Sequence, residues 1–148
     1  MDDSRKRLKG SEKRDLFKYW HKNAPGMRGD FYATDADFCL VSKHPPGTVA
    51  YLDYKGSGEG ISFSEAIQYN EWLQHAPVFI VEGPNPETGP FVIKRYLGGD
   101  FRPEPPEVEL EEIVRVNDWR GFGAWEASLR QKYSRRGGWG GNLRTGSK

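Results

Sequence analysis

Two segments of alternating polar and apolar residues, 31–42 and 48–55, predict a pair of β-strands in the first half of the chain. Both segments are rich in the β-branched and aromatic residues that strands favour. The residues between them, 44–47, read HPPG and have the composition of a turn. We therefore predict that the two strands pair as a β-hairpin.

Charged residues gather on one face of this predicted hairpin. Side chains two residues apart lie on the same face of a strand. Asp35 and Asp37 therefore share one face of the first strand, while Asp53 and Lys55 share one face of the second strand, opposite Leu52. If the strands pair in register, the acidic groups converge.

The remaining periodicity predicts three helices and two further strands. In chain order these are a helix from Ser11 to the stop at Pro25-Gly26, a helix from Ser62 to Pro77, strands over 78–82 and 90–97, and a helix over 122–133. Ser62 and Glu65 have the spacing of a capping box. Residues 100–112 are rich in proline and glutamate, so we expect an exposed connection there. This order predicts an α/β fold with a mixed sheet flanked by helices.

Length and composition indicate a single domain over residues 11–133, between a disordered basic segment at 1–10 and a flexible basic, glycine-rich tail at 134–148. No apolar run approaches the ~20 residues of a membrane-spanning helix, and no signal peptide is recognisable, so no membrane partner is expected. The single Cys39 leaves no internal disulfide and is typical of a reducing, cytoplasmic setting.

The net charge of +1 conceals a strong asymmetry along the chain. Residues 1–28 hold nine Lys/Arg against four Asp/Glu, and residues 115–148 hold eight against two. The middle, residues 29–114, holds five Lys/Arg against fifteen Asp/Glu. Basic ends that contact a phosphate backbone, around an acidic centre that gathers metal ions, are one interpretation. Basic runs that serve only solubility are the other.

The acidic groups and the lysine match the needs of phosphodiester hydrolysis. Mg²⁺ prefers hard oxygen ligands and often binds one or two carboxylates plus water and substrate phosphate. Asp37 and Asp53 are therefore candidate ligands for Mg²⁺ or Mn²⁺, together with the main-chain carbonyl of Tyr54. Lys55 is a candidate catalytic residue that orients the attacking water or stabilises the developing negative charge.

The layout of Asp37, fifteen intervening residues and the triplet Asp53-Tyr54-Lys55 resembles the PD-(D/E)xK nuclease superfamily, over residues 11–97. This superfamily includes restriction enzymes, Holliday-junction resolvases and recombination exonucleases. The resemblance implies a restriction-endonuclease-like αβββαβ core whose hairpin carries the Asp and the (D/E)xK triplet. It assigns the first metal-binding acid to Asp37, the second to Asp53 and the lysine to Lys55.

Further site residues are implied by the same resemblance. Many members place an additional glutamate on the first helix, for which Glu12 is the candidate, with Asp15 behind it. Recombination-type members also carry Gln-x-x-x-Tyr on the helix after the lysine. Here Gln68 is followed by Trp72 at the tyrosine position, and Gln68 is a candidate for positioning DNA or the metal site.

Two departures from the superfamily pattern concern the acidic residues. Ala36 stands where proline commonly precedes the first acid, and Asp53 stands where glutamate is commoner. Several members write the first acid as acid-x-Asp-hydrophobic, which the sequence from Asp35 to Phe38 resembles. We therefore choose Asp37 over Asp35 as the metal ligand. The structural alternative is that these acids belong to a turn or edge strand, and that Lys55 ends a solvated strand.

Aromatic and basic residues interleave near the C-terminus, a composition typical of nucleic-acid surfaces. Aromatic residues at helical spacing more often belong to a core, and we expect this of Trp125 and Leu129. The candidate nucleic-acid contacts are Arg120, Arg130, Arg135, Arg136 and Trp139.

The sequence thus predicts a divalent-metal-dependent nuclease acting on DNA, with RNA not excluded, in phage or prokaryotic DNA processing, repair or recombination. Relatives that cut two strands often act as homodimers, so a homodimer is one expectation. The alternative is a non-catalytic nucleic-acid-binding protein on the same fold. A third option is a protein-interaction module whose C-terminal helix docks a partner.

Overall fold

The computed structural model describes residues 38–139 and five positions closer to the N-terminus, namely Lys13, Leu16, Tyr19, Asn23 and Pro25. The chain divides into two compact units, Met1–Asp35 and Ala36–Lys148. Within the described residues, no helix combines the length and the apolar character needed to span a membrane.

In the first unit, the four described positions from Lys13 to Asn23 have helical backbone conformation. The Asn23 side-chain amide donates a hydrogen bond to the Tyr19 carbonyl oxygen at 2.8 Å. At these positions the predicted first helix is confirmed. Glu12 and Asp15, the predicted acids of this helix, lie outside the described residues.

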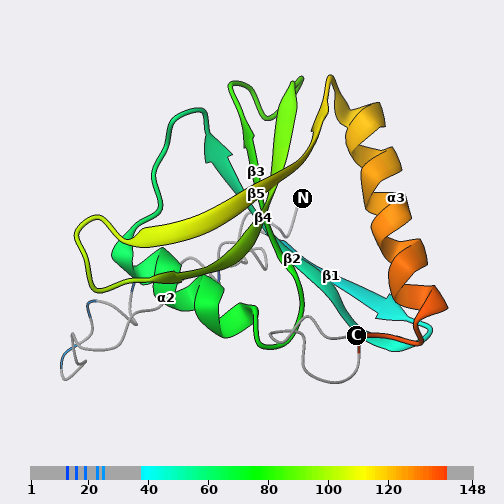
Figure 1. The fold of residues 1–148 in the computed structure, drawn as a ribbon, viewed down its shortest axis with the longest axis horizontal. Helices are drawn as coiled ribbons and strands as arrows, with labels where there is room; N and C mark the ends of the chain where they lie inside the picture. The colour runs from blue at the N-terminus through cyan, green and yellow to red at the C-terminus, as the bar shows by residue number, and fades with distance from the viewer. Residues whose placement is uncertain are drawn as a thin grey trace, which may run out of the picture. The chain divides into compact units, whose positions relative to one another are not determined.

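The second unit is a five-stranded mixed sheet with two helices, labelled as in Figure 1. Its elements in chain order are β1 (Phe38–Lys43), β2 (Pro46–Gly56), α2 (Phe63–Trp72), β3 (Val78–Gly83), β4 (Phe91–Asp100), β5 (Glu107–Val116) and α3 (Trp119–Arg135). The spatial order of the strands is β1-β2-β3-β4-β5. Only β2 and β3 are parallel; the other neighbours are antiparallel. The predicted α/β class with a mixed sheet and flanking helices is confirmed.

The predicted hairpin is formed by β1 and β2, with Phe38 opposite Leu52 and Lys43 opposite Pro46. The register shifts between Leu40 and Val41, so that Val49 on β2 has no partner on β1. Such a β-bulge bends a strand and increases its twist. The part of the predicted first strand before Phe38 lies outside the described residues.

The parallel pair of β2 and β3 is joined by α2, which begins as predicted at Ser62. The Ser62 hydroxyl accepts from the Glu65 main-chain N–H at 3.2 Å, and the Glu65 carboxylate accepts from the Ser62 N–H at 2.9 Å. These two bonds form the capping box that starts the helix. The chain then returns along β3, so that Asp53 lies beside Ile80 and Lys55 beside Glu82.

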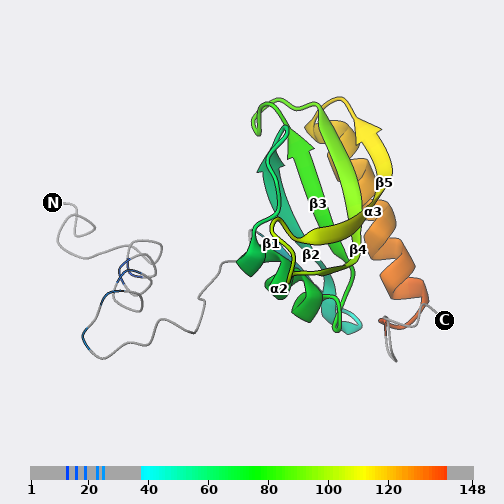
Figure 2. The ribbon, with the colours of Figure 1, turned by 60° about the vertical axis from the view of Figure 1, so that its left-hand side comes forward.

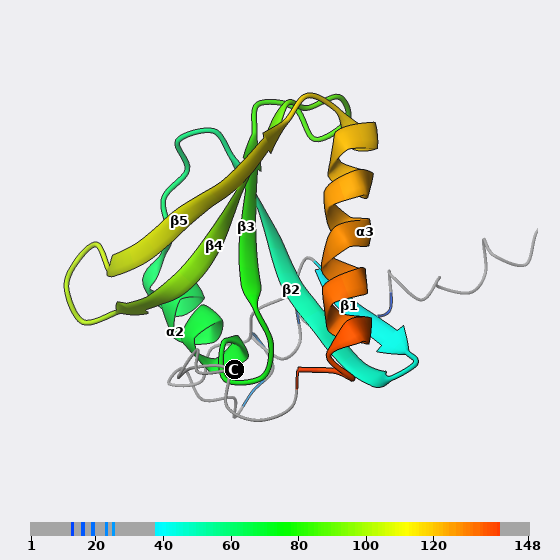
Figure 3. The same ribbon diagram turned by 45° about the vertical axis from the view of Figure 1, so that its right-hand side comes forward.

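The two helices cover opposite faces of the sheet (Figures 2 and 3). On the α3 face, Phe122, Leu129 and Tyr133 pack against Leu52, Phe79, Val81, Phe91 and Ile93. On the α2 face, Tyr69 packs with Val78, Ile80 and Tyr96. Alternation along β2 and β3 therefore sends neighbouring residues into two separate cores, each beneath its own helix.

The prediction of an exposed connection at residues 100–112 is wrong, because β5 begins at Glu107 and takes up the second half of this range. Val108 and Leu110 are half-buried and alternate with exposed Glu107, Glu109 and Glu111. This is the pattern of an edge strand with one packed face, which the prolines just before it obscured. Two register irregularities lie between β4 and β5, and Figure 3 shows this hairpin curving toward α2.

The C-terminal helix is longer than predicted, and packing continues beyond it. The α3 helix starts at Trp119, capped by the Asp118 side chain, and ends at Arg135. Trp139 lies in the segment predicted to be a flexible tail. Its indole N–H donates to the Val49 carbonyl oxygen at 2.8 Å, and its ring contacts Tyr133 edge-on. The Val49 carbonyl oxygen at the bulge is thus hydrogen-bonded by the last described residue.

Two glycines of α3 provide a matched test of this packing. A Cβ at Gly121 would lie 2.9 Å from the Val116 Cβ, whereas a Cβ at Gly123 would meet nothing within 4 Å. We expect Gly123→Ala to stabilise the fold by about 0.5–1 kcal/mol through helix propensity. Gly121→Ala should lower stability because Val116 must move. Urea unfolding measures both; equal effects of the two substitutions would contradict the packing of α3 on β5.

Candidate functional site

The two charged site residues predicted on β2 are both buried, at 8% exposure for Asp53 and 4% for Lys55. They are the only buried charged residues within the described part of the chain. As predicted, their side chains leave β2 on one face, toward α2, and Leu52 joins the core beneath α3. Burying charge in this way costs several kcal/mol unless the groups are paired.

Lys55 is paired with carboxylates from two segments that follow it in the chain. Its ammonium donates a hydrogen bond to Glu65 Oε2, and Glu59 Oε2 lies 4.0 Å from the same nitrogen. Burial opposes the ionisation of Glu65, but the hydrogen bonds from Lys55 and Ser62 outweigh it and hold the Glu65 pKa below its ordinary range. Lys55 is therefore anchored by an ionised partner.

Asp53 is held by a tyrosine from the same helix. The fully buried Tyr69 donates its hydroxyl to Asp53 Oδ2. The Tyr69 ring packs edge-on against Tyr96, whose hydroxyl donates to the Asn70 side-chain oxygen at 2.5 Å. Burial raises the pKa of Tyr96 to about 12. This tyrosine therefore stays protonated as a donor at neutral pH.

Charges on the α2 face continue across the sheet with alternating sign. Glu82 lies beside Lys55 on the neighbouring strand and accepts from Lys94 at 3.1 Å. Lys94 is opposite Glu112 on β5, and Glu112 in turn forms a two-point ion pair with Arg115. Opposite charges on adjacent strands stabilise their pairing.

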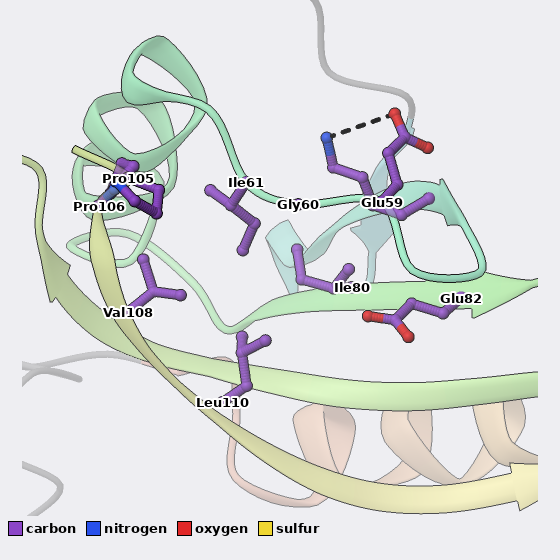
Figure 4. A pocket seen from close by; sticks show the side chains of 10 residues that line it. Glu59, Gly60, Ile61, Ile80, Glu82, Pro105, Pro106, Val108 and Leu110 are labelled. Carbon is purple, nitrogen blue, oxygen red and sulfur yellow. Dashed lines mark ion pairs between the residues drawn. The ribbon is translucent and has the colours of Figure 1, made fainter.

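A cavity of about 290 Å³ opens beside Lys55 on this face, and we call it the Lys55 pocket. Its lining residues are Lys55, Glu59, Gly60, Ile61, Ile80, Glu82, Pro105, Pro106, Val108 and Leu110. Figure 4 shows Ile61, Val108 and Leu110 toward one end and Glu59 and Glu82 toward the other. The pocket therefore has an aliphatic end and a charged end, and the buried lysine belongs to the charged end.

The curvature of the β4–β5 hairpin closes this pocket. The tip of the hairpin reaches α2, where Asn70 donates to the Gly99 carbonyl oxygen at 3.0 Å and Phe63 meets Phe101 edge-on. Because residues 105–110 follow this tip, they become a wall opposite Ile61. A straight hairpin would leave the sheet face open.

Glu65 and Tyr69 are the α2 residues that contact Lys55 and Asp53, and the role of Gln68 toward DNA or a metal stays a prediction. Gln68 is half-buried on α2, whereas the contacts come from Glu65 and Tyr69. The four-residue spacing expected between Gln68 and Trp72 thus occurs one turn earlier, at Glu65 and Tyr69. The capping-box spacing had singled out Glu65, but only as a helix start, and no sequence signal had singled out Tyr69.

Only one of the other predicted metal ligands, Tyr54, lies within the described residues. Asp35 and Asp37 lie outside the described residues, as does Glu12. Phe38, which follows Asp37 in sequence, is paired with Leu52, the neighbour of Asp53. The Tyr54 side chain lies toward the other core and donates its hydroxyl to the Gly83 carbonyl oxygen, so its predicted metal contact remains a main-chain one.

The predicted nucleic-acid contacts are all on or just after α3. Arg120, Arg130, Arg135 and Arg136 are exposed. Trp139 is half-buried by its contacts with the core, and the Arg136 guanidinium lies 5.9 Å from its ring centroid. These basic groups and the Lys55 pocket therefore belong to opposite faces of the sheet.

Of the predicted metal ligands, the described residues contain only the Asp53 carboxylate and the Tyr54 main-chain carbonyl. Among the described residues, no three His, Cys, Asp or Glu side chains are grouped as a metal site. Mg²⁺ often binds only one or two carboxylates, and completes its shell with water and phosphate. A buried carboxylate at Asp53 is compatible with that mode, with Asp37 as the predicted second ligand.

No protein-family model, no curated protein and no solved structure matches this chain. We therefore infer a function from the chemistry of Asp53, of Lys55 and of the pocket that Lys55 lines.

The Lys55–Glu65 pair gives a pH-dependent prediction. Because folding lowers the Glu65 pKa, its contribution to stability is fully present above the pKa of an unfolded glutamate. It is lost as the pH falls through the lower, folded value. We expect Glu65→Gln to destabilise the protein by about 3 kcal/mol at neutral pH, because Lys55 loses its closest anion. The acid-induced loss of stability should also become shallower than in the wild type.

Urea unfolding across the acid range measures both effects. Glu71→Gln is the control, because Glu71 is exposed on the same helix. It should keep the wild-type stability and pH profile. Wild-type behaviour of Glu65→Gln would show that the ion pair does not hold Lys55.

Proposed function

We propose that this protein is a divalent-metal-dependent phosphodiesterase of nucleic acid, with DNA as the substrate. The observation that carries the proposal is the burial of Asp53 and Lys55 on one strand face, with a dedicated partner for each and a pocket lined by Lys55. A lysine that only ended a solvated strand would not need a buried position or a carboxylate from another element.

The strand order supports the finer fold proposal, a PD-(D/E)xK-type αβββαβ core. Such a core needs a hairpin that carries the Asp-x-Lys triplet, then a helix, then a strand parallel to the second hairpin strand. The elements β1, β2, α2 and β3 match the last two strands before the helix, the helix and the strand after it. The remaining strand of an αβββαβ core would come before Phe38, outside the described residues.

Hydrolysis joins a water oxygen to phosphorus and breaks the bond from phosphorus to the leaving oxygen, which takes up a proton. The Lys55 ammonium has three N–H donors, and the bond to Glu65 uses one. The others can be donated to the attacking water or to a phosphate oxygen as its charge grows. Because Glu65 fixes the ammonium, little ordering remains to be done when substrate arrives.

A bound Mg²⁺ or Mn²⁺ would lower the pKa of its water and neutralise phosphate charge. Asp37, Asp53 and the main-chain carbonyl of Tyr54 are the residues proposed to hold it. Tyr69 would orient the Asp53 carboxylate, as second partners of metal ligands commonly do.

The acidity of the site adds a requirement for a cation. Glu59, Glu65 and Glu82 all lie beside or near Lys55, so a phosphate approaching without a cation meets net negative charge. Nucleic acid should therefore reach this site only when a divalent cation is present.

A second candidate function is nucleic-acid binding without cleavage, through α3. Within Trp119–Arg135 there are four basic residues and one acidic residue, Glu126. The four basic side chains are exposed, and an exposed basic surface binds phosphates without a metal. Binding that persists in EDTA and weakens steeply with salt would favour this candidate.

Lys55→Ala compared with Lys94→Ala tests the leading proposal. Both lysines project from the sheet and pair with a glutamate, but only Lys55 is buried in the proposed site. With Mg²⁺ or Mn²⁺ and labelled single-stranded, double-stranded and branched DNA, we expect Lys55→Ala to slow cleavage by about a hundredfold. Lys94→Ala should stay near the wild-type rate.

Circular dichroism and urea unfolding separate loss of catalysis from loss of fold, and Lys55→Gln serves as a milder variant. Metal-dependent cleavage that survives both Lys55 substitutions in folded protein would rule out the proposed role of this residue.

The choice between the two neighbouring acids is testable in the same assay. Asp37→Asn should reduce cleavage as strongly as Asp53→Asn, because each removes a proposed metal ligand. Asp35→Asn should have a small effect. The reverse order of Asp35 and Asp37 would assign the ligand to Asp35.

A further inference from the structure

We propose that the Lys55 pocket receives one unpaired nucleobase of a single-stranded or frayed nucleic acid. The proposal rests on the proposed function, because a phosphate held near Lys55 brings an adjoining base within reach of the cavity. It adds a substrate class, because the pocket selects unpaired over paired nucleotides.

The pocket lining matches the two kinds of surface that a nucleobase presents. A base has apolar faces and an edge of hydrogen-bonding groups. The aliphatic residues of the lining are Ile61, Ile80, Pro105, Pro106, Val108 and Leu110. The charged residues are Lys55, Glu59 and Glu82. Aliphatic side chains can lie against the faces of the base while the charged end meets its edge.

The carboxylates should make the pocket prefer some bases over others. A carboxylate accepts hydrogen bonds from the exocyclic amino groups of bases, as in acidic contacts to cytosine. Glu82 is half-buried at the charged end, and Lys94 pairs with it from outside the lining. Bases that carry an amino group should therefore bind better than thymine, which has none.

The walls of the pocket explain why the base must be unpaired. The cavity is bordered by Ile61 in the loop after β2 and by Pro105, Pro106, Val108 and Leu110 (Figure 4). A volume of about 290 Å³ has room for one base. A paired base would first have to leave the duplex, at the cost of its stacking and pairing.

The test uses a single-stranded oligonucleotide with one 2-aminopurine and the duplex made from it, with Ca²⁺ as the cation. Because the described residues that line the pocket include no aromatic side chain, transfer of the base from its stacked neighbours should raise its fluorescence. We expect this rise with the single strand and not with the duplex.

Two variants fill the pocket. Leu110→Trp adds bulk to its aliphatic end, and Gly60→Phe adds a side chain where a Cβ meets nothing within 4 Å. Each should weaken single-strand binding by about tenfold or more, as measured by anisotropy of a labelled strand. Ile113→Trp is the matched control, because Ile113 is exposed on the same strand outside the lining, and it should bind as the wild type does.

Hydrolysis of bis(p-nitrophenyl) phosphate by the wild-type protein tests the proposed function separately, because this ester has no nucleobase. If the ester is not hydrolysed but the filled variants lose single-strand affinity, the base pocket stands and the phosphodiesterase proposal fails. If both filled variants fold and bind as tightly as the wild type, the base pocket is overturned. An equal fluorescence rise with the duplex overturns it too.

Discussion

The structure depends on the burial of an ammonium and a carboxylate between the sheet and α2. Lys55 and Asp53 lie on β2, which has a neighbouring strand on both sides and a helix over each face. Burying either charge there without a partner would cost several kcal/mol, because the charge loses its hydration. The partners, Glu65 and Tyr69, come from one helix, so these contacts help to fix the position of α2 on the sheet.

This constraint divides the molecule into two unlike halves. Beneath α3, the sheet face is covered by a continuous apolar and aromatic core, including Phe79, Phe91 and Phe122. Beneath α2, the apolar core is smaller, and the charged row from Lys55 to Arg115 lies beside it. The α3 half can provide most of the stability that holds the costly groups of the α2 half in place.

The sequence predicted the structural features that depend on neighbouring residues. The hairpin followed from alternation around the turn at 44–47, and the start of α2 followed from Ser62 and Glu65. The separation of Asp53 and Lys55 from Leu52 followed from the period of a strand. These features depend on residues close in sequence, so the sequence carries them directly.

The features that the sequence did not reveal depend on contacts between distant segments. The sequence of β5 resembles a charged linker. It is a strand because it pairs with β4, which lets Val108 and Leu110 pack against the core beneath α2. Tyr69 has no special character in sequence, and becomes a site residue only because the β2–α2–β3 crossover sets its hydroxyl against Asp53. In sequence Trp139 belongs to a tail, and its role becomes clear only from its hydrogen bond to the Val49 carbonyl oxygen at the bulge.

The Glu65 carboxylate serves two elements at once, since Oε1 closes the first turn of α2 and Oε2 holds Lys55. The local opening of that turn and the release of the lysine are therefore one event, with a shared free energy. Fraying of the helix start would separate Lys55 from its closest carboxylate, and a ligand that draws Lys55 away would weaken the helix start. The amide of Glu65, bonded to Ser62, would report this motion through hydrogen exchange, so a probe on the backbone reads the state of a buried side chain.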